Sequence, residues 1–434
     1  MKQALTSLDP RGVGSRISQC RAAHPADPAD GEAVVILAYY FPPENAIGAD
    51  RPFRFAKYLP RFGFVPRVIA NNAGESREID SVARVPRRDR HSIALALAAR
   101  AARAVQRLLP YNEQLAWAPH AVAAGSRVID TDSARLVLST SPPLATHLAA
   151  LRLKQRLGTK WIADFRDPLM GNPCRTRKFG KVYDGALERC IFGHADFLIA
   201  NTESTAEIWR ERYPQWAGKI RTIWNGFDPE EVLRPLVIPR RPQALLAHVG
   251  SIYGLRDPRP VLSAVERSIA QGWLNPAALQ VLFAGPLEER LFSLADPPFS
   301  TLAAKGCFRC ENRLLSRPEA RRLIAAADYL LLIDHASAEA AHVPAKLFEY
   351  IQVGRPILAL TSRNSPCDQI LAKAGVPYKC IYMDASAEQA SACLQEFLSL
   401  PNRAVHASRW FWEQFDGTRQ TETLASLFRS LLAS

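Results

Sequence analysis

The chain has 434 residues, of which 48% are hydrophobic and 22% are charged, and this composition is ordinary for a soluble globular protein. Its length exceeds what a single core usually fills and predicts two or three domains, and the absence of any run of about 18 apolar residues predicts no membrane-spanning helix. The net charge of +13 favours anionic partners such as sugar nucleotides, an anionic membrane surface or nucleic acid. A solvated basic surface without a partner is the open alternative.

The N-terminus and the cysteines indicate the cellular compartment in which the protein is expected. The first 20 residues lack the apolar segment of a secretory signal, and the eight cysteines lack the spacing of a disulfide framework. Both features predict a reducing, cytoplasmic setting. Cys307 and Cys310 form a single C-x-x-C without a second pair, which falls short of the four ligands of a zinc site, so no metal site is expected.

The first half of the chain alternates between strand and helix patterns. Residues 1–31 are rich in Ala, Arg, Asp and Pro without periodicity and are expected to be disordered. The run AVVILAYYF, from residue 33, is typical of a strand buried on both faces of a parallel sheet. Further strands are expected, with helices between them, at 64–70, 135–140, 160–165, 197–202 and 219–226. This order predicts a first domain at 32–230, built from βαβ units.

The same alternation restarts after a proline-rich, charged segment, which predicts a linker at 231–243. Strands are expected at 245–250, 279–285, 328–334, 356–361 and 379–384. They predict a second domain at 244–408, and a helical tail at 409–434 is expected to pack back on the first. The fold class is therefore α/β, with two Rossmann-like doubly wound domains facing across an interdomain cleft. Because ligands of such sheets bind beyond the carboxyl ends of the strands, candidate residues should follow strands.

Two candidate groups follow strands of the first domain. The loop after the first strand contains Gly48 and leads into a helix, so its backbone N–H groups are candidates for contact with a phosphate. At the end of the 160–165 strand, Asp164 and Asp167 flank Arg166, an arrangement that is costly to bury without function or mutual pairing. One hypothesis is that Asp164 or Asp167 binds substrate hydroxyls while Arg166 holds the geometry. The alternative is a structural Arg–Asp pair that closes the loop.

A third candidate group follows the first strand of the second domain. Residues 250–257 read GSIYGLRD, in which Gly250 and Gly254 permit close backbone approach and Arg256 can bind a phosphate through two hydrogen bonds. The segment is not a G-x-G-x-x-G, which argues against a dinucleotide fingerprint. Phosphate binding is the favoured interpretation, and an ordinary turn is the alternative.

The fourth candidate is the segment 342–360, HVPAKLFEYIQVGRPILAL, which predicts a helix with Pro344 first and Lys346 third. A cation at that end is unfavourable by about 0.3–1 kcal/mol because the helix dipole already makes it positive. Lys346 therefore suggests a bound anion, and Glu349 is a candidate acceptor for sugar or ribose hydroxyls. The alternative is a solvated Lys346–Glu349 ion pair.

Together these segments resemble glycosyltransferases of the GT-B fold, specifically the large family 4 of retaining enzymes. The resemblance runs from Val34 to the C-terminus and keeps the family's order of motifs. Its most specific pieces are YYFPPENAIGADRPFRFAKYLPRFGF, LSTSPPLATHLAALRL, WIADFRDP, ANTES, IWNGFDP, HVGSIYGLRDP and VPAKLFEYIQVGRPILAL. The most similar members assemble capsule, lipopolysaccharide or exopolysaccharide. The resemblance implies a nucleotide-sugar donor on the second domain and an acceptor on the first.

The family's donor-binding residues are kept only in part. Its ribose-binding glutamate, the last of an E-x7-E motif, corresponds to Glu349, and Ala341 stands in place of the first glutamate. The Arg and Lys that bind the diphosphate correspond to Ser251 and Arg256, so one cation is kept. We infer that Lys346 supplies the missing charge. The family's glycine-rich loop after the first strand is reduced to Gly48 and Ala49.

The resemblance implies front-face transfer with retention, without a metal or cofactor, from a UDP- or GDP-linked sugar. The diphosphate leaves while Arg256, Lys346 and helix N–H groups stabilise its charge, and Asp164 or Asp167 orients the acceptor hydroxyl. The predicted catalytic residues are Asp164, Arg166, Asp167, Arg256 and Lys346. The predicted donor contacts are Gly48, Gly250, Ser251, Arg256, Lys346, Leu347, Phe348 and Glu349.

Two basic amphipathic segments bear on the acceptor, which is expected to be a glycan or a polyprenyl-linked sugar. They are RPFRFAKYLPRF (51–62) and SIALALAARAARAVQRLLP (92–110), in which Arg100, Arg103 and Arg107 share one face. Such segments suit the surface of an anionic membrane and would place the protein at its inner face. Ordinary core-facing helices with a wet basic side fit equally well.

Two rival functions stay open. A sugar-nucleotide epimerase or hydrolase shares the GT-B fold but needs its own acid and base carboxylates. A non-catalytic scaffold that binds nucleotide or membrane would fit the missing glutamate and arginine. Nucleic-acid binding is not expected, because the chain has no recognisable reader motif.

Overall fold

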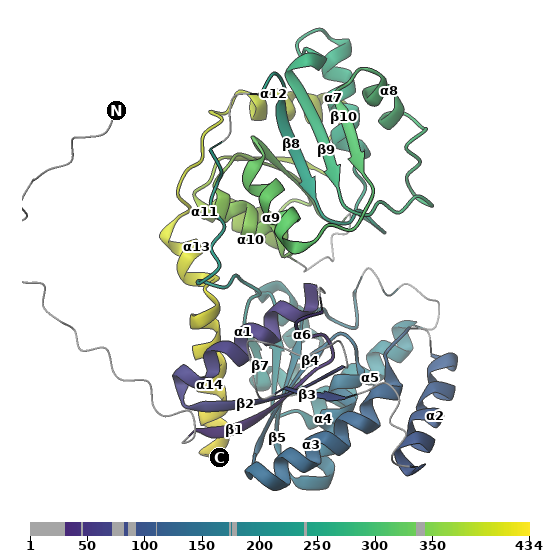
Figure 1. Cartoon of the computed structure of the whole chain (residues 1–434), viewed down its shortest axis with the longest axis vertical. Coiled ribbons are helices and arrows are strands. Elements are labelled where there is room, and N and C mark those ends of the chain that lie inside the picture. The colour runs from purple at the N-terminus through teal and green to yellow at the C-terminus, as the bar shows by residue number, and fades with distance from the viewer. Residues whose placement is uncertain are drawn as a thin grey trace, which may run out of the picture.

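The computed structural model describes residues 31–44, 47–71, 82–85, 93–109, 111–172, 175, 180–237, 241–335 and 343–434. Apart from its last residue, the predicted N-terminal extension lies outside the described residues, as do Ala341 and the linker residues 238–240. The described residues form two bodies joined by two crossings (Figure 1).

The described part of the N-terminal body is a parallel sheet of seven strands in the order β3-β2-β1-β4-β5-β6-β7. The strands are β1 (Glu32–Ala38), β2 (Phe64–Asn71), β3 (Val82–Val85), β4 (Leu136–Ser141), β5 (Lys160–Phe165), β6 (Phe197–Ala200) and β7 (Ile220–Thr222). The helices are α1 (Asp50–Tyr58), α2 (Ile93–Leu108), α3 (Ala118–Asp132), α4 (Ala145–Leu157), α5 (Gly180–His194) and α6 (Glu203–Arg212).

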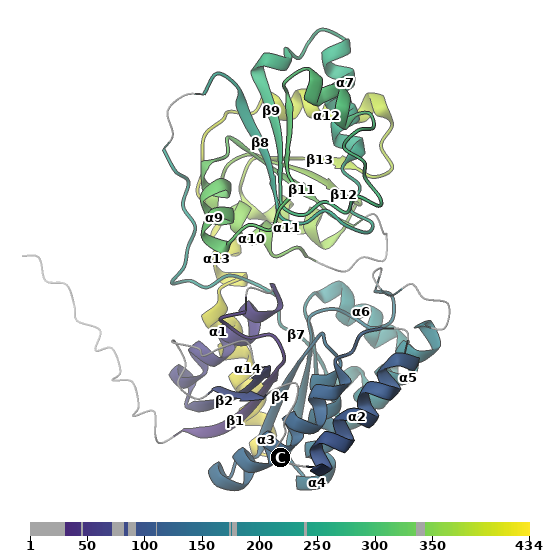
Figure 2. The ribbon, with the colours of Figure 1, turned by 45° about the vertical axis from the view of Figure 1, so that its right-hand side comes forward.

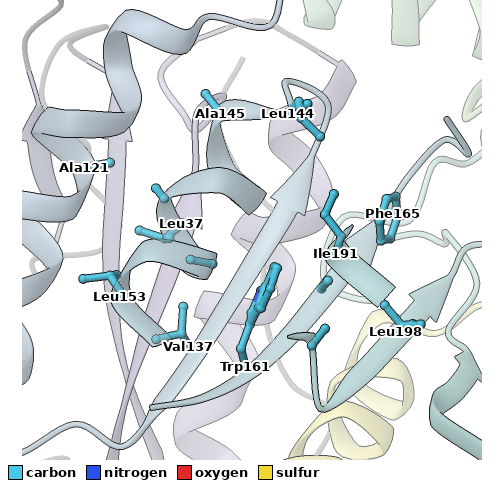
Figure 3. Close-up of a cluster of buried hydrophobic side chains, with 14 of the residues drawn as sticks. Leu37, Ala121, Val137, Leu144, Ala145, Leu153, Trp161, Phe165, Ile191 and Leu198 are labelled. Atoms are coloured by element: carbon cyan, nitrogen blue, oxygen red, sulfur yellow. The ribbon is translucent and has the colours of Figure 1, made fainter. Parts of the chain in front are cut away.

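Strand β1 shows why a continuous apolar run forms a central strand. Successive side chains point to opposite faces of a sheet, so both faces must be covered when every residue is apolar. Val35 and Leu37 enter the core beneath α3, α4 and α5, whereas Val34 and Ile36 enter the core that α1 and α14 cover. Figure 3 shows the first of these cores, in which Val137 and Trp161 lie on the sheet and Leu153 lies on a helix that covers it.

The described part of the C-terminal body is a parallel sheet of six strands in the order β10-β9-β8-β11-β12-β13. The strands are β8 (Ala244–Val249), β9 (Leu279–Ala284), β10 (Phe308–Glu311), β11 (Tyr329–Ile333), β12 (Ile357–Thr361) and β13 (Tyr378–Tyr382). The helices are α7 (Arg259–Ala270), α8 (Phe299–Ala304), α9 (Arg317–Ala326), α10 (Lys346–Val353), α11 (Pro366–Ala374) and α12 (Ala387–Leu398). Two helices end the chain, α13 (Arg409–Gln414) and α14 (Gly417–Leu432).

Helix α14 packs on the first body although it follows the second in sequence (Figures 1 and 2). The rings of Phe428 and Phe64 lie 5.3 Å apart, and Arg429 Nη2 donates a hydrogen bond of 3.0 Å to the carbonyl oxygen of Phe62. Leu424 and Phe428 are fully buried in the same core as Val34. The last helix is therefore part of the first hydrophobic core.

The two crossings between the bodies run side by side. Phe227 N–H donates to Phe415 O, and Gly417 N–H donates to Phe227 O, each at 3.0 Å. A Cβ at Gly226 would come within 2.2 Å of Phe415 O, and one at Gly417 within 2.8 Å of Phe227 O. Glycine is needed at both positions because the backbones approach so closely.

Candidate functional site

The C-terminal end of β8 meets the first turn of α10 at Gly250. Gly250 has φ +121°, and a Cβ on it would lie 2.7 Å from Lys346 Nζ. The neighbouring strand ends in the same way, because Gly285 has φ +144° and its Cβ would strike the backbone of Gly250 at 2.6 Å. The two glycines let the strand ends and the lysine side chain pack together.

Lys346 is the first residue of α10, so the prediction that it stands third is corrected. The residues before it form a tighter turn, in which Leu347 N–H donates a hydrogen bond of 3.0 Å to Pro344 O, three residues earlier. The α-helix therefore begins at Lys346 and not at Pro344. Its amine lies 3.0 Å from His248 Nε2. Burial, followed by the charge of Arg256, holds the pKa of Lys346 well below its usual value.

Arg256 is the second cation at this edge. Its guanidinium carbon lies 4.9 Å from the centre of the Tyr253 ring, and its buried Nε has no hydrogen-bond partner. Among the described residues, no carboxylate forms an ion pair with Arg256 or Lys346. Burial raises the pKa of the nearby Asp334 carboxyl, against the charge of Arg256, and Asp334 already accepts bonds of 2.8 Å from His335 N–H and Thr361 Oγ1. An anion bound here would neutralise the charge of Arg256 and favour the charged form of Lys346.

Glu349 lies one turn into α10 and does not pair with Lys346 there. Its carboxylate lies 3.7 Å from Arg321 Nη1 of α9, and its side chain is 30% exposed. Burial raises the pKa of Glu349, while Arg321 and Arg317 lower it. The solvated Lys346–Glu349 pair considered from the sequence is therefore replaced by a pair between α9 and α10.

The other predicted donor-binding residues differ in how far their side chains are exposed. Leu347 and Phe348 are 0% and 1% exposed and belong to the core, so their side chains have a packing role. Their N–H groups bond Pro344 O and Ala345 O within the turn. Ser251 is half-buried beside Gly250 and stays a candidate.

In the first body, the carboxylate of Asp164 is saturated. Arg51 Nη2 and Nε donate to it at 2.8 and 3.0 Å, Thr140 Oγ1 donates at 2.9 Å, and Asp164 is fully buried. Arg51 also bonds the carbonyls of Ile223 and Trp224. Because no face of Asp164 is open to an acceptor, we reassign it from orienting substrate to holding β5, α1 and the end of β7 together.

Arg166 also has a positioning role. Its guanidinium donates to the carbonyl oxygens of Gly48 and Pro142, and burial lowers its pKa. A Cβ at Gly48 would lie 2.1 Å from Arg166 Nη1, so that face of the glycine is filled by the guanidinium. Asp167 is half-buried at the end of the same strand and is the remaining carboxylate candidate for the acceptor.

A chain of ion pairs links the two bodies beside this site. Arg317 of α9 pairs with Asp50 of α1 at 3.0 Å and with Glu231 at 2.9 Å. Arg321 lies 3.5 Å from Glu231 and 3.7 Å from Glu349. Helices α9 and α10 therefore lie on the side of the second body that faces α1 (Figure 2).

Two residues that organise the site were not predicted. His248 contacts Lys346 across 98 positions of sequence, and Arg51 contacts Asp164 across 113. A histidine inside the apolar strand LLAHVG was a visible signal, because a polar residue in a buried strand needs a partner. Arg51 gave no such signal, since it lies in a segment that reads as a basic helix.

No group of three His, Cys, Asp or Glu side chains suited to a metal ion occurs in the part of the chain that the structure describes. The candidate site thus offers two basic side chains on the second body, and carboxylate and guanidinium groups on the first.

The match to a family of known proteins covers most of the first body. Residues 52–231 match the family model described as Glycosyltransferase Family 4, a segment that contains Asp164, Arg166 and Asp167 but neither Arg256 nor Lys346. No curated protein sequence matches the chain.

Solved structures resemble the chain over nearly its whole length. Sucrose-phosphate synthase from Thermosynechococcus elongatus has a TM-score of 0.65 at 13% identity, covering 93% of this chain and 99% of that one. A glycosyltransferase from Rickettsia africae has a TM-score of 0.62 at 12% identity, covering 93% and 99%. HepE from Anabaena, in complex with UDP and glucose, has a TM-score of 0.61 at 12% identity, covering 92% and 100%. The predicted fold class, two doubly wound α/β domains in the GT-B arrangement, is confirmed.

Proposed function

We propose that this protein is a retaining glycosyltransferase that moves a sugar from a nucleotide-sugar donor to a glycan or lipid-linked acceptor during polysaccharide biosynthesis. The observation that carries the proposal is the pair of cations, Lys346 and Arg256, that meets at the end of β8 without a carboxylate partner among the described residues. The family match of the first body and the UDP and glucose bound to HepE support the same class of reaction.

The chemistry follows from the charge that develops during transfer. The bond between the sugar's anomeric carbon and the diphosphate oxygen breaks, and the acceptor oxygen forms a bond to that carbon on the same face. The acceptor's proton leaves with the diphosphate. Lys346 and Arg256 stabilise the growing negative charge because both side chains are positioned before the bond breaks, and the bound diphosphate favours the charged form of Lys346. This chemistry requires neither a metal nor a cofactor.

Glu349 and Asp167 complete the proposed site. Glu349 is aligned by Arg321 and would accept hydrogen bonds from the ribose hydroxyls of a UDP- or GDP-linked donor. Gly250 and Ser251 would lie against the diphosphate. Asp167 would orient the acceptor hydroxyl, since Asp164 is saturated by Arg51 and Thr140.

We further propose that the protein works in the cytoplasm and contacts an anionic membrane through α2. Leu97, Val105 and Leu108 are 60%, 50% and 86% exposed and share one face, while Ala99 is buried on the opposite face. Arg100, Arg103 and Arg107 are exposed beside the apolar face. An exposed apolar face next to three cations suits a helix that lies in a lipid headgroup layer. Among the described helices, none is long and apolar enough to cross a bilayer.

The test is transfer by the purified protein from UDP- and GDP-sugars, with lipid-linked and oligosaccharide acceptors. Lys346→Ala and Glu349→Ala should each lower the rate about a hundredfold or more while leaving the unfolding temperature within a few degrees of wild type. The matched control is Lys305→Ala, because Lys305 is an exposed lysine of the same domain.

The same experiment separates the rival functions. Epimerised or hydrolysed sugar without an acceptor would point to an epimerase or hydrolase. Nucleotide binding without turnover of any donor would point to a scaffold. Wild-type rates in both Lys346→Ala and Glu349→Ala would refute the placement of the donor site.

A further inference from the structure

His248 is a polar residue in the middle of the second core. It lies in β8 between Ala247 and Val249, and its side chain is fully buried. Nδ1 lies 3.0 Å from the carbonyl oxygen of Leu331 in β11, Nε2 lies 3.0 Å from Lys346 Nζ, and the backbone of Gly250 also interacts with the ring. Both nitrogens are thus occupied, one by the sheet and one by the proposed donor site.

The contact with Leu331 indicates the tautomer of the ring. A carbonyl oxygen can only accept a hydrogen bond, so the proton of neutral His248 lies on Nδ1. Nε2 then carries a lone pair, and that lone pair faces the amine of Lys346. Burial, followed by the charge of Lys346, lowers the pKa of His248 and keeps the ring neutral.

Helix α10 is held against β8 by two residues one turn apart. Lys346 contacts the side chain of His248, and Tyr350 OH accepts a hydrogen bond of 3.0 Å from Val249 N–H. Gly250 comes next in the chain and leaves room for the lysine, whose Nζ would lie 2.7 Å from an added Cβ. The path of the lysine side chain is therefore bounded on two sides.

We propose that His248 is a positioning residue, whose Nε2 accepts a hydrogen bond from Lys346 and aims the remaining N–H groups of that amine at the donor's diphosphate. The inference rests on the proposed function, since it assigns the anion to the donor. A lysine side chain loses rotamer freedom when it is fixed in one conformation. The contact with His248 restricts the lysine side chain before the donor binds, so less rotamer freedom is lost on binding. A preorganised cation therefore binds an anion more tightly.

Two substitutions separate the contacts of the ring. Asn at position 248 keeps a donor near the position of Nδ1 for Leu331 O but has no acceptor that reaches Lys346. Gln at 248 reaches the position of Nε2 with its carbonyl oxygen and gives up the bond to Leu331. If His248 were only a core residue, the two variants would affect ligand binding alike.

The experiment measures binding of UDP and of inorganic pyrophosphate by isothermal titration calorimetry. His248→Asn should weaken both ligands about tenfold, whereas His248→Gln should stay within about threefold of wild type. In a Lys346→Met background, His248→Asn should have no further effect, because the contact it removes is already gone. Equal losses in the Asn and Gln variants, or a loss that persists in the Lys346→Met background, would overturn the inference.

A second measurement does not depend on any ligand. The rate at which acetic anhydride acetylates Lys346 can be followed by mass spectrometry of the full chain after digestion. Loss of the Nε2 acceptor removes a contact that favours the charged amine, so Lys346 should react faster in His248→Asn and at the wild-type rate in His248→Gln. An unchanged rate in His248→Asn, with circular dichroism showing an intact fold, would also overturn the inference. Absence of sugar transfer alongside the expected rates would count against the proposed function alone.

Discussion

At the scale of single residues, the molecule separates charges that hold the fold from charges left for a ligand. Arg51 and Asp164 neutralise each other in the core of the first body, and each has further hydrogen bonds. Lys346 and Arg256 have no such partner among the described residues and meet beside a neutral histidine. Burying a cation without a counterion is unfavourable, so such an arrangement is expected where a ligand supplies the missing charge.

The first prediction concerns Asp164 and stability. Asp164→Ala should lower the free energy of unfolding by about 3–5 kcal/mol, because it leaves Arg51 charged and buried. The control is Asp132→Ala, which removes a carboxylate whose arginine partner, Arg67, is 36% exposed, and it should cost about 0–1 kcal/mol. Urea unfolding followed by circular dichroism measures both. Similar losses in the two variants would contradict a structural role for Asp164.

The second prediction concerns pH and the amine of Lys346. Burial and the charge of Arg256 lower its pKa in the empty site, against the charge of Glu349, and His248 is held neutral beside it. A bound diphosphate adds negative charge and raises that pKa, so binding should take up a proton in the interval between the two values. Affinity should then fall as pH rises through the interval, by up to about tenfold per pH unit.

Proton uptake is measured by calorimetry above pH 7 in two buffers of different ionisation enthalpy, where the diphosphate itself is already ionised. Lys346→Met should abolish the uptake, and Lys305→Met should leave it unchanged. Equal uptake in Lys346→Met and wild type would place the proton elsewhere.

Local patterns predicted Lys346, Arg256 and Glu349, because each lies just after a strand or in the first turn of a helix. His248 and Arg51 escaped because their roles depend on contacts across 98 and 113 positions, which no local pattern records. For the same reason, the sequence showed Asp164 and Arg166 as a motif, but it did not show that both residues hold the fold through contacts with distant parts of the chain.

At the scale of elements, helix α2 has three different faces. Leu95, Ala99, Ala102 and Gln106 turn toward the protein, Leu97, Val105 and Leu108 face outward, and three arginines lie beside them. Gln106 fixes the end of the helix, since its Oε1 accepts a bond of 2.9 Å from Glu113 N–H. The outward face therefore contributes little to the fold, as the proposed membrane contact requires.

The third prediction tests that face. Leu97→Ser/Val105→Ser/Leu108→Ser and Arg100→Gln/Arg103→Gln/Arg107→Gln should each reduce binding to vesicles rich in phosphatidylglycerol, because the first removes apolar area and the second removes about 1 kcal/mol per cation. Both should unfold near the wild-type temperature, since exposed side chains are changed. Vesicle sedimentation measures the effect, with pure phosphatidylcholine as the uncharged control. Wild-type binding by both variants would exclude α2 as the contact.

Strand and helix elements were predicted best where both faces of the sheet are covered. The segments that became β1 and β11 are almost entirely apolar, and those that became β4 and β5 contain the apolar runs LVL and WIA, so their pattern is clear. Strands β3 and β10 were not predicted because they are four-residue edge strands, VARV and FRCE, that carry charged residues. An edge strand is half-solvated and paired on one side, so its sequence resembles a loop.

At the scale of the whole molecule, two bodies meet through the paired crossings and a chain of ion pairs. The crossing joins Phe227 to Phe415 and Gly417 by backbone hydrogen bonds of 3.0 Å. The ion pairs join Asp50 of the first body to Arg317 of the second, and continue through Glu231 and Arg321 to Glu349. The proposed ribose contact is thus connected to the relative position of the bodies.

The fourth prediction is that these ion pairs hold the bodies together. Arg317→Glu should increase the radius of gyration in solution scattering, because it places a carboxylate against Asp50 and Glu231, 3.0 and 2.9 Å from the present guanidinium. The pairs are about 40% exposed and each contributes roughly 0.2–1 kcal/mol, so wild type should also expand as salt is raised. Asp50→Arg/Arg317→Glu should recover part of the compactness, since the pair with α1 is restored with reversed charges.

Arg309→Glu is the matched control, because Arg309 pairs with Glu311 inside the second body. If Arg317→Glu scattered like Arg309→Glu at every salt concentration, the hydrogen-bonded crossing alone would set the arrangement of the bodies.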